Sequence, residues 1–445
     1  MRSMGRVRGC RGMDLGSTPD SPSPGRFAAT LSRGGRGENE REEQELAGPL
    51  SHIKVLELSR VLAGPWAAQT LADLGADVIK VERPGAGDDT RAWGPPWAGD
   101  QSAYFLSTNR GKRSITIDFE RPEGQELVRR LAAEADVVVE NFKVGGLVKY
   151  GLDYASLKAV NPRLVYCSIT GFGQTGPYRN RAGYDFMIQG MGGLMSITGQ
   201  PDGEPGAGPV KVGVAVTDIF TGLYATIGIM GGLAHRDRTG EGQQVDLALL
   251  DVQVAVLANQ AMNALVGGKP PQRLGNAHPN IVPYQAFATR DGHIILAVGN
   301  DGQFAKFAQV AGRPELAKDE RYATNPARVA HRKELVPLLE EIVRTRDSAD
   351  WLAALETVGV PCGPINDLAA VFADPHVQAR NIRQDLPHPD LGTVPTVASP
   401  IRYSATPLVH DTAPPTLGQH TDAVLAEALG LSAADIAELR DKGVV

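Results

Sequence analysis

Asp218 is the residue whose setting most favours covalent chemistry. It ends a β-branched, apolar segment, residues 211–217, and precedes an apolar run that we predict to be a helix at 219–235. In open α/β sheets, ligands and reacting groups gather where a strand hands over to a helix. A carboxylate at such a place is a candidate nucleophile.

Asp218 also fits a purely structural role. An aspartate before an apolar helical run is typical of an N-cap, whose carboxylate accepts hydrogen bonds from the first free N–H groups of the helix. The residue pattern alone leaves both roles open.

The elements that would position Asp218 alternate between strand and helix. The strands are expected at 53–58, 77–82, 114–119, 136–140 and 164–169, and the helices at 66–74, 123–135 and 153–160. Alternation of this kind predicts an α/β fold with a doubly wound, mostly parallel, Rossmann-like sheet. The loop at 63–65 lacks the GxGxxG spacing of a dinucleotide site, although N–H groups at the following helix N-terminus can still meet a ligand.

The chain changes character after two long helical runs at 219–235 and 247–266. A hairpin is expected at 284–298, followed by helices at 303–311, 332–346 and 348–358, a Pro-rich stretch at 386–415 with little regular pattern, and helices at 422–429 and 433–442. We therefore predict a large α/β domain at 49–280, which would bind the substrate, and a smaller α+β domain at 281–372. Residues 373–445 are expected to return to the large domain.

Residues 1–48 are rich in Arg, Gly, Ser and Pro, with a charged run at 38–45, and are expected to be disordered. Their Arg-rich opening is similar to a mitochondrial transit peptide, but Asp14, Asp20 and the later Glu run weaken that interpretation. An upstream start codon explains the extension equally well. We expect a cytoplasmic protein, with the mitochondrial matrix as the alternative.

Composition excludes several classes of function. The net charge is −6 and no Lys/Arg cluster recurs, so no nucleic-acid partner is expected. Cys10, Cys167 and Cys362 lie far apart, which argues against a zinc site or a disulfide framework and indicates a reducing compartment. No metal spacing, P-loop or GxSxG motif is present. The longest apolar run, 219–234, is too short and too glycine-rich for a membrane span, so no membrane partner is expected.

Several motifs follow one another in a fixed order: VLAGP at 61–65, LGADVIKVE at 74–82, KRS at 112–114, VENF at 139–142, TGEGQ at 239–243, GPIN at 363–366 and LGQHT at 417–421. From about residue 48 to its end, the chain resembles a family III CoA-transferase of the CaiB/BaiF type. The segments at 83–90, 93–96, 170–177, 181–185 and 281–287 most resemble the succinate–hydroxymethylglutarate (glutarate) CoA-transferase branch.

The resemblance implies an interlocked homodimer and places the family's aspartyl nucleophile on Asp218. The implied reaction passes through an enzyme aspartyl-CoA thioester, which conserves the free energy of the thioester and needs neither ATP nor metal. Coenzyme A thioester is then a substrate, and no permanently bound cofactor is expected. The implied partners are an acyl-CoA and a small carboxylic acid.

The resemblance also implies a set of CoA contacts. They are Leu62, Ala63, Arg83, Ile117, Asp118, Phe119, Glu120, Asn141, Phe142, Lys143, Lys149, Ala182, Gly183, Tyr184 and Asp185. Arg83 and Lys149 suit phosphate groups, although a charged residue of this kind, taken alone, is more often an ordinary surface charge. Asp185 is as well explained as a structural carboxylate as it is as a site acid.

Two departures from related branches narrow the chemistry. Leu62 stands where the oxalate-using branch has Gln, and residues 275–278 stand near its four-glycine loop, which argues against oxalate or formyl-CoA. Tyr184 stands where the racemase branch has a His base, and a tyrosine lacks the near-neutral pKa that such a base needs.

These motifs favour transfer of CoA from an acyl-CoA, with succinyl-CoA expected, to a small carboxylic acid, with a dicarboxylate expected. The guanidinium of Arg91 or Arg181 is a candidate to bind the second carboxylate. The alternatives are a 2-methylacyl-CoA racemase on the same fold and a non-catalytic acyl-CoA-binding protein.

Overall fold

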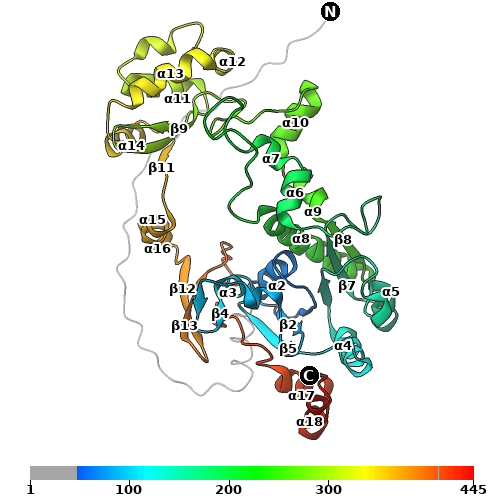
Figure 1. The fold of residues 1–445 in the computed structure, drawn as a ribbon. Coiled ribbons are helices and arrows are strands. Elements are labelled where there is room, and N and C mark those ends of the chain that lie inside the picture. Colours follow the sequence, from blue (N-terminus) through cyan, green and yellow to red (C-terminus); the bar gives the residue numbers. More distant parts are fainter. Residues whose placement is uncertain (1–47, 409) are drawn as a thin grey trace, which may run out of the picture. The chain divides into compact units, whose positions relative to one another are not determined.

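The computed structural model describes residues 48–408 and 410–445 and contains a six-stranded parallel sheet (Figure 1). The strands of this sheet are β1 (Lys54–Glu57), β2 (Asp77–Glu82), β5 (Lys112–Thr116), β6 (Val137–Glu140), β7 (Val165–Thr170) and β8 (Gln244–Ala248). Their spatial order is β5-β2-β1-β6-β7-β8, and every neighbouring pair is parallel. The chain therefore reverses its direction of winding between β1 and β6, and ligands bind at such a switch point in doubly wound sheets.

Helices cover both faces of the sheet because successive strand residues point to opposite sides. On one face Val55, Val78 and Val137 pack against α2 (Ala63–Asp73) and α8 (Val216–Thr239). The opposite face of the sheet packs against α4 (Pro122–Glu134), α5 (Tyr154–Val160), α17 (Thr421–Leu429) and α18 (Ala433–Asp441). The result is a mixed α/β fold with two apolar layers.

Helix α8 ends at Gly240, which takes the left-handed conformation with φ 79°. Of the described helices, α8 is long and apolar enough to cross a membrane, and α9 (Leu249–Ala255) and α10 (Ala258–Gly267) would count as a second such segment only if joined across a 74° bend. Ala225, Ile229 and Leu233 of α8 are buried in the core against the sheet. These contacts identify α8 as a core helix of the α/β fold.

A second apolar core lies within residues 282–360. It is built on the antiparallel strands β9 (Tyr284–Ala288), β10 (His293–Ala297) and β11 (Cys362–Pro364), with α11 (Asp301–Val310), α12 (Asn325–Ala330), α13 (Arg332–Val343) and α14 (Ser348–Thr357). Phe287, Ile294 and Trp351 are almost fully buried in this core.

Two short hairpins and the C-terminal helices complete the described chain. The hairpins are β3 (Trp97–Ala98) with β4 (Gln101–Ser102) and β12 (Arg383–His388) with β13 (Gly392–Val397). The backbone of the C-terminal segment bonds to the sheet region, with Gly111 N donating to Thr412 O at 3.0 Å and His420 N donating to Ser114 O at 2.9 Å. The remaining helical turns are η1 (Asp89–Ala92), α3 (Ala103–Leu106), η2 (Val148–Tyr150), α6 (Asp185–Met191), α7 (Leu194–Ile197), η3 (Pro314–Ala317), α15 (Leu368–Ala373) and α16 (Pro375–Ala379).

Three predictions of local structure are wrong. Residues 211–215, all within the described part of the chain, form no strand, and α8 begins at Val216 rather than at 219. The single helix expected at 247–266 is strand β8 followed by α9 and α10. The Pro-rich stretch from 386 contains part of the β12–β13 hairpin. Disorder was predicted for residues 1–48, and residues 1–47 lie outside the described part of the chain.

Candidate active site

Asp218 lies in the first turn of α8, three residues after the N-cap Ala215. It is not the cap of this helix, so the N-cap interpretation is wrong. The first free N–H groups of α8 bond instead to Asp185, whose Oδ2 accepts from Thr217 N at 2.8 Å and from Asp218 N at 3.4 Å. A carboxylate at a helix N-terminus also interacts favourably with the helix dipole.

Asp185 is itself held in place from α6. Gln189 Nε2 donates to Asp185 Oδ1 at 2.7 Å, and Gln189 Oε1 accepts from Val212 N at 3.0 Å. The segment before α6 lies against Gly171, where a Cβ on Gly183 would come within 2.4 Å of the Gly171 Cα. The contact requires glycine at both positions, and it fixes the entry to α6.

Burial and the neighbouring Asp185 carboxylate together raise the pKa of Asp218 to about 7. No protein hydrogen bond to the Asp218 carboxylate is present among the described residues, and the half-buried side chain keeps only partial contact with solvent. Burial and the charge of Asp218 also raise the pKa of Tyr104 to about 12, and the Tyr104 ring contacts Trp93 edge to face at 5.2 Å. A carboxylate with a raised pKa is more basic and therefore a stronger nucleophile.

Gly222, one turn beyond Asp218, brings α8 against the start of α2. A Cβ at position 222 would lie 2.7 Å from Ala63 O and 3.0 Å from the Cβ of Trp66. Glycine at position 222 therefore permits a close approach between the two helices. It places α8, one turn beyond Asp218, against Ala63, one of the expected CoA contacts.

Leu62 and Ala63 are both buried. Both residues follow β1, at the point where the sheet reverses its winding. Asn141, which follows β6, bonds to the same loop, with Arg60 N donating to Asn141 Oδ1 at 2.9 Å and Asn141 Nδ2 donating to Arg60 O at 2.7 Å. The structure thus brings Leu62, Ala63 and Asn141 together at the switch point.

Three aromatic rings gather next to this point. Phe119 contacts Phe142 at 5.8 Å and Tyr150 at 5.6 Å, both edge to face. Lys149 lies over the Tyr150 ring at 4.4 Å, and the Tyr150 hydroxyl raises the pKa of Lys149. The cluster therefore brings together three predicted CoA contacts, Phe119, Phe142 and Lys149, from separate segments of the chain.

The remaining expected contacts differ in accessibility. Arg83 and Glu120 are exposed and form an ion pair at 4.0 Å, and Lys143 is exposed. Asp118 accepts from Glu120 N at 3.0 Å and pairs with Arg121, while Ile117 is buried in the core. Ala182 and Tyr184 are exposed beside the half-buried Gly183.

Arg91 is engaged within the protein. Its guanidinium bonds to Glu82 at 2.8 and 2.7 Å and lies over the Phe105 ring at 3.6 Å. The interpretation of Arg91 as a binder of a substrate carboxylate is therefore wrong. Arg181 is exposed, lies over the rings of Phe172 and Tyr178, and has no carboxylate partner within the described residues.

A buried charge cluster beneath the loop after β1 was not predicted. It consists of Glu57, Lys80, Asp88 and Lys112, with Lys80 Nζ 3.2 Å from Glu57 and 2.9 Å from Asp88, and Lys112 Nζ 2.8 Å from Glu57. The signal available in the sequence was the placement of charged residues within apolar strand patterns. The cluster balances two carboxylates with two ammonium groups, as fully buried charges require.

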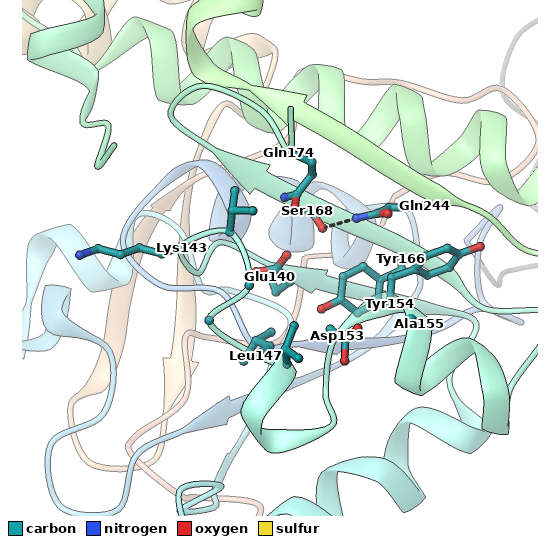
Figure 2. A pocket seen from close by; sticks show the side chains of 14 residues that line it. Glu140, Lys143, Leu147, Asp153, Tyr154, Ala155, Tyr166, Ser168, Gln174 and Gln244 are labelled. Atoms are coloured by element: carbon teal, nitrogen blue, oxygen red, sulfur yellow. Dashed lines mark hydrogen bonds between the residues drawn. The ribbon is translucent and has the colours of Figure 1, made fainter. Parts of the chain in front are cut away.

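A cavity of about 220 Å³ lies at the ends of β6 and β7 (Figure 2). Glu140, Ser168 and Gln244 line it, and Gln244 Nε2 donates to Ser168 Oγ at 3.1 Å. Burial raises the pKa of Glu140 to about 7. Lys143 also lines the cavity, which therefore adjoins the expected CoA contacts.

Within residues 48–408 and 410–445, no group of three or more His, Cys, Asp or Glu side chains is arranged to hold a metal ion. The polar groups around Asp218 are carboxylates, amides and hydroxyls. This arrangement suits attack by a carboxylate on an acyl carbonyl.

Comparison with known proteins gives consistent matches over most of the chain. Residues 50–421 match the family model described as CoA-transferase family III. The chain is 58% identical over 385 residues to the succinate–glutarate CoA-transferase of Agrobacterium fabrum, covering 85% of this chain and 95% of that protein. It is 47% identical over 397 residues to the human succinyl-CoA:glutarate CoA-transferase, covering 89% of this chain and 90% of that one. The crystal structure of a CAIB/BAIF family protein from Brucella suis, 58% identical, matches with a TM-score of 0.76 over 86% of this chain and 100% of that one.

Proposed function

Because the chain belongs to CoA-transferase family III, we propose that it moves CoA from succinyl-CoA to glutarate or a similar dicarboxylate. Two relatives with 58% and 47% identity carry these substrates in their names. The observation that carries the mechanism is the half-buried Asp218 carboxylate in the first turn of α8, whose pKa is raised to about 7.

In the first half-reaction an Asp218 oxygen attacks the thioester carbonyl of succinyl-CoA. The C–S bond breaks, leaving a succinyl–aspartyl anhydride and the CoA thiolate. The thiolate then attacks the Asp218 carbonyl, forming the aspartyl-CoA thioester and releasing succinate. In the second half-reaction a glutarate carboxylate attacks the carbonyl of this thioester, and its C–S bond breaks to give a glutaryl–aspartyl anhydride and the CoA thiolate. The thiolate then attacks the glutaryl carbonyl, which yields glutaryl-CoA and releases the Asp218 carboxylate.

The surroundings of Asp218 support this sequence of steps. The carboxylate form needed for attack predominates above pH 7 and is poorly solvated, which favours nucleophilic attack. Asp185 holds the first turn of α8 through backbone bonds and leaves the Asp218 side chain free. The N-terminus of α2, adjacent through the Gly222 contact, offers N–H groups to an oxyanion.

CoA is proposed to lie across the switch point between β1 and β6. The backbone of Leu62 and Ala63, together with Asn141, would hold the portion close to Asp218. The aromatic cluster formed by Phe119, Phe142 and Tyr150 offers ring faces and edges to the adenine. The exposed cations around it, Arg83, Lys143 and Lys149, suit the phosphates.

The second carboxylate of the acceptor is proposed to bind Arg181. This guanidinium is exposed, lies four residues before Asp185, and is held over two aromatic rings. Its planar fork matches a carboxylate in two parallel hydrogen bonds. Because the rings already restrict the Arg181 side chain, it loses less conformational entropy when it binds a carboxylate.

A second copy of this chain is proposed to cover the exposed side of α8, as in an interlocked homodimer. Phe220, Leu223, Tyr224, Ile227 and Met230 recur every three or four residues along one helical face and are exposed, with Ile227 at 63%. An exposed apolar stripe of this length is typical of an interaction surface. The adjacent α6 also exposes Phe186, Met187 and Met191.

The proposed nucleophile is tested by mixing the enzyme with succinyl-CoA in the absence of an acceptor. We expect CoA to become attached to the peptide that contains Asp218, in a bond cleaved by hydroxylamine and discharged by glutarate. Asp218→Asn should carry no CoA, because a neutral amide cannot form the anhydride. Asp251→Asn is the matched control, because Asp251 occupies the same third position in α9 but is exposed. Transfer by the wild type without any adduct at Asp218 would refute the assignment.

A further inference from the structure

The loop after β1 contains a strained residue. Val61 has φ 73°, in the left-handed region that β-branched residues avoid because Cβ clashes with the neighbouring carbonyl. Such a conformation persists only where the surrounding structure holds it in place. Val61 immediately precedes Leu62 and Ala63, and the Ala63 carbonyl lies against Gly222 of α8, one turn beyond Asp218.

The buried charge cluster holds this loop at three points. Both carboxylate oxygens of Asp88 accept from Val61 N, at 3.2 and 3.3 Å. Lys80 Nζ donates to Ser59 O at 2.9 Å, and Lys112 Nζ donates to Pro65 O at 2.9 Å. Asp88 is thus the member of the cluster that bonds directly to the strained residue.

Asp88 has a fixed position and a fixed charge. It is 1% exposed, lies 2.9 Å from Lys80 Nζ, and its Oδ1 accepts from Thr90 N at 3.0 Å and Thr90 Oγ1 at 2.8 Å. Burial alone would raise the pKa of Asp88, but Lys80 and the Thr90 bonds lower it to about 2. The carboxylate therefore stays ionised over the whole range in which the enzyme can be assayed.

We propose that Asp88 is a positioning residue for the transfer reaction. It holds Val61 in the left-handed conformation and so sets the place of the Leu62–Ala63 backbone beside Asp218. This inference rests on the proposed roles of Asp218 and of Leu62 and Ala63. Asp88 acts through the Val61 backbone and not on a substrate.

The substitution Val61→Gly separates this role from a general effect on stability. Glycine takes positive φ values without a steric penalty, so a loop with glycine in place of Val61 needs less support from Asp88. In Asp88→Asn an NH2 group replaces one of the two oxygens that Val61 N shares, so Val61 N keeps at most one acceptor and either Lys80 or Thr90 loses its own. If Asp88 acts by holding Val61, Val61→Gly should restore activity that Asp88→Asn has lost.

The experiment compares the wild type, Asp88→Asn, and Asp88→Asn combined with Val61→Gly. For each, kcat/KM for succinyl-CoA and the single-turnover rate of CoA attachment to the Asp218 peptide are measured per folded molecule. We expect Asp88→Asn to lower both at least tenfold, about 1.4 kcal/mol. The double variant should recover at least threefold.

Asp73→Asn is the control, because it removes the carboxylate from the buried pair with Arg110 at the far end of α2. Per folded molecule it should stay within twofold of the wild type, and Val61→Gly should not raise its activity. If Asp88→Asn does not fold, Thr90→Val takes its place, because it removes one hydrogen-bond donor to Asp88. Thr90→Val should lower activity at least threefold, and Val61→Gly should reverse this loss.

The outcomes separate this inference from the proposed function. A wild type that attaches no CoA to the Asp218 peptide refutes the nucleophile and leaves the inference without its premise. If the wild type forms the adduct and Asp88→Asn forms it equally fast, the positioning role is wrong. It is also wrong if activity falls and Val61→Gly restores none of it.

Discussion

Replacing Asp218 with Asn should abolish transfer and, at the same time, stabilise the fold above pH 7. Burial and Asp185 raise the pKa of Asp218 from 3.8 to about 7, so ionising this carboxylate costs more in the folded than in the unfolded chain. For a group with a raised folded pKa, the favourable contribution is complete below the unfolded value and is lost as pH rises through the folded value. The loss therefore grows between about pH 4 and pH 7.

The size of this effect follows from the two pKa values. At 1.36 kcal/mol for each pKa unit, ionisation of Asp218 lowers the free energy of unfolding by about 4 kcal/mol at pH 8 and by about 2 kcal/mol at pH 5. Because Asp218 is only partly shielded from solvent, screening reduces both figures, to about 2 and about 1 kcal/mol. Asn has nearly the same shape and carries no charge, so the variant should escape this cost.

The assay is urea unfolding of the wild type, Asp218→Asn and Asp251→Asn at pH 5 and pH 8. Asp218→Asn should exceed the wild type by about 2 kcal/mol at pH 8 and by about half as much at pH 5. The exposed control should match the wild type at both pH values. An Asp218→Asn protein that is less stable than the wild type at pH 8 would show that Asp218 is a structural carboxylate and would contradict the reasoning.

Three further predictions concern catalysis, specificity and assembly. The rate of CoA attachment should fall about tenfold from its plateau by pH 6, because the Asp218 carboxylate is protonated below its pKa of about 7. Asp185→Asn should move this decline to lower pH, because it removes a like charge. An unmoved midpoint would contradict the proposed effect of Asp185 on the pKa of Asp218. Arg181→Ala should reduce the preference for glutarate over butyrate at least tenfold, about 1.4 kcal/mol, while the neighbouring Arg179→Ala should leave it intact; equal preferences in both variants would exclude Arg181. Ile227→Glu should convert a dimer into a monomer in light scattering, since a charge would enter the apolar stripe of α8, and an unchanged mass would place the interface elsewhere.

The parallel sheet could be predicted where its strands are short apolar runs between clear breaks. Strand β2 is found at Asp77–Glu82, as expected, because Gly75 and the Arg83-Pro84 pair bound a β-branched run. Strand β8 was missed because Gln244–Ala248 continues without a break into the apolar residues of α9. Its strand conformation depends on pairing with β7, a contact that the sequence does not display.

The error at residues 211–217 has the same origin. Lys211 to Val214 are rich in β-branched residues, but they lie next to α6, where Val212 N bonds to Gln189, rather than next to a strand. β-propensity describes how well a residue fits a sheet surface and gives no strand where no partner is present. Asp218 remains a predicted nucleophile, but the structural reason offered for it, the end of a strand, was wrong.

The buried charges could not be predicted because their pairing depends on the order of the strands. Glu57, Lys80 and Lys112 come from β1, β2 and β5, which are neighbours only after the sheet has formed. Each residue taken alone is a charge in an apolar run. Only the fold shows that, together with Asp88, the three form a cluster of two carboxylates and two ammonium groups.

Glu57 between two lysines also restricts how this sheet can change over evolutionary time. Replacing any one of Glu57, Lys80 or Lys112 leaves an uncompensated charge among fully buried atoms, which typically costs about 3–5 kcal/mol. A cluster changed to apolar side chains in one concerted event could be as stable as the present one. The three positions are thus separated from other workable combinations by unstable intermediates, and we expect them to vary together among related sequences or not at all.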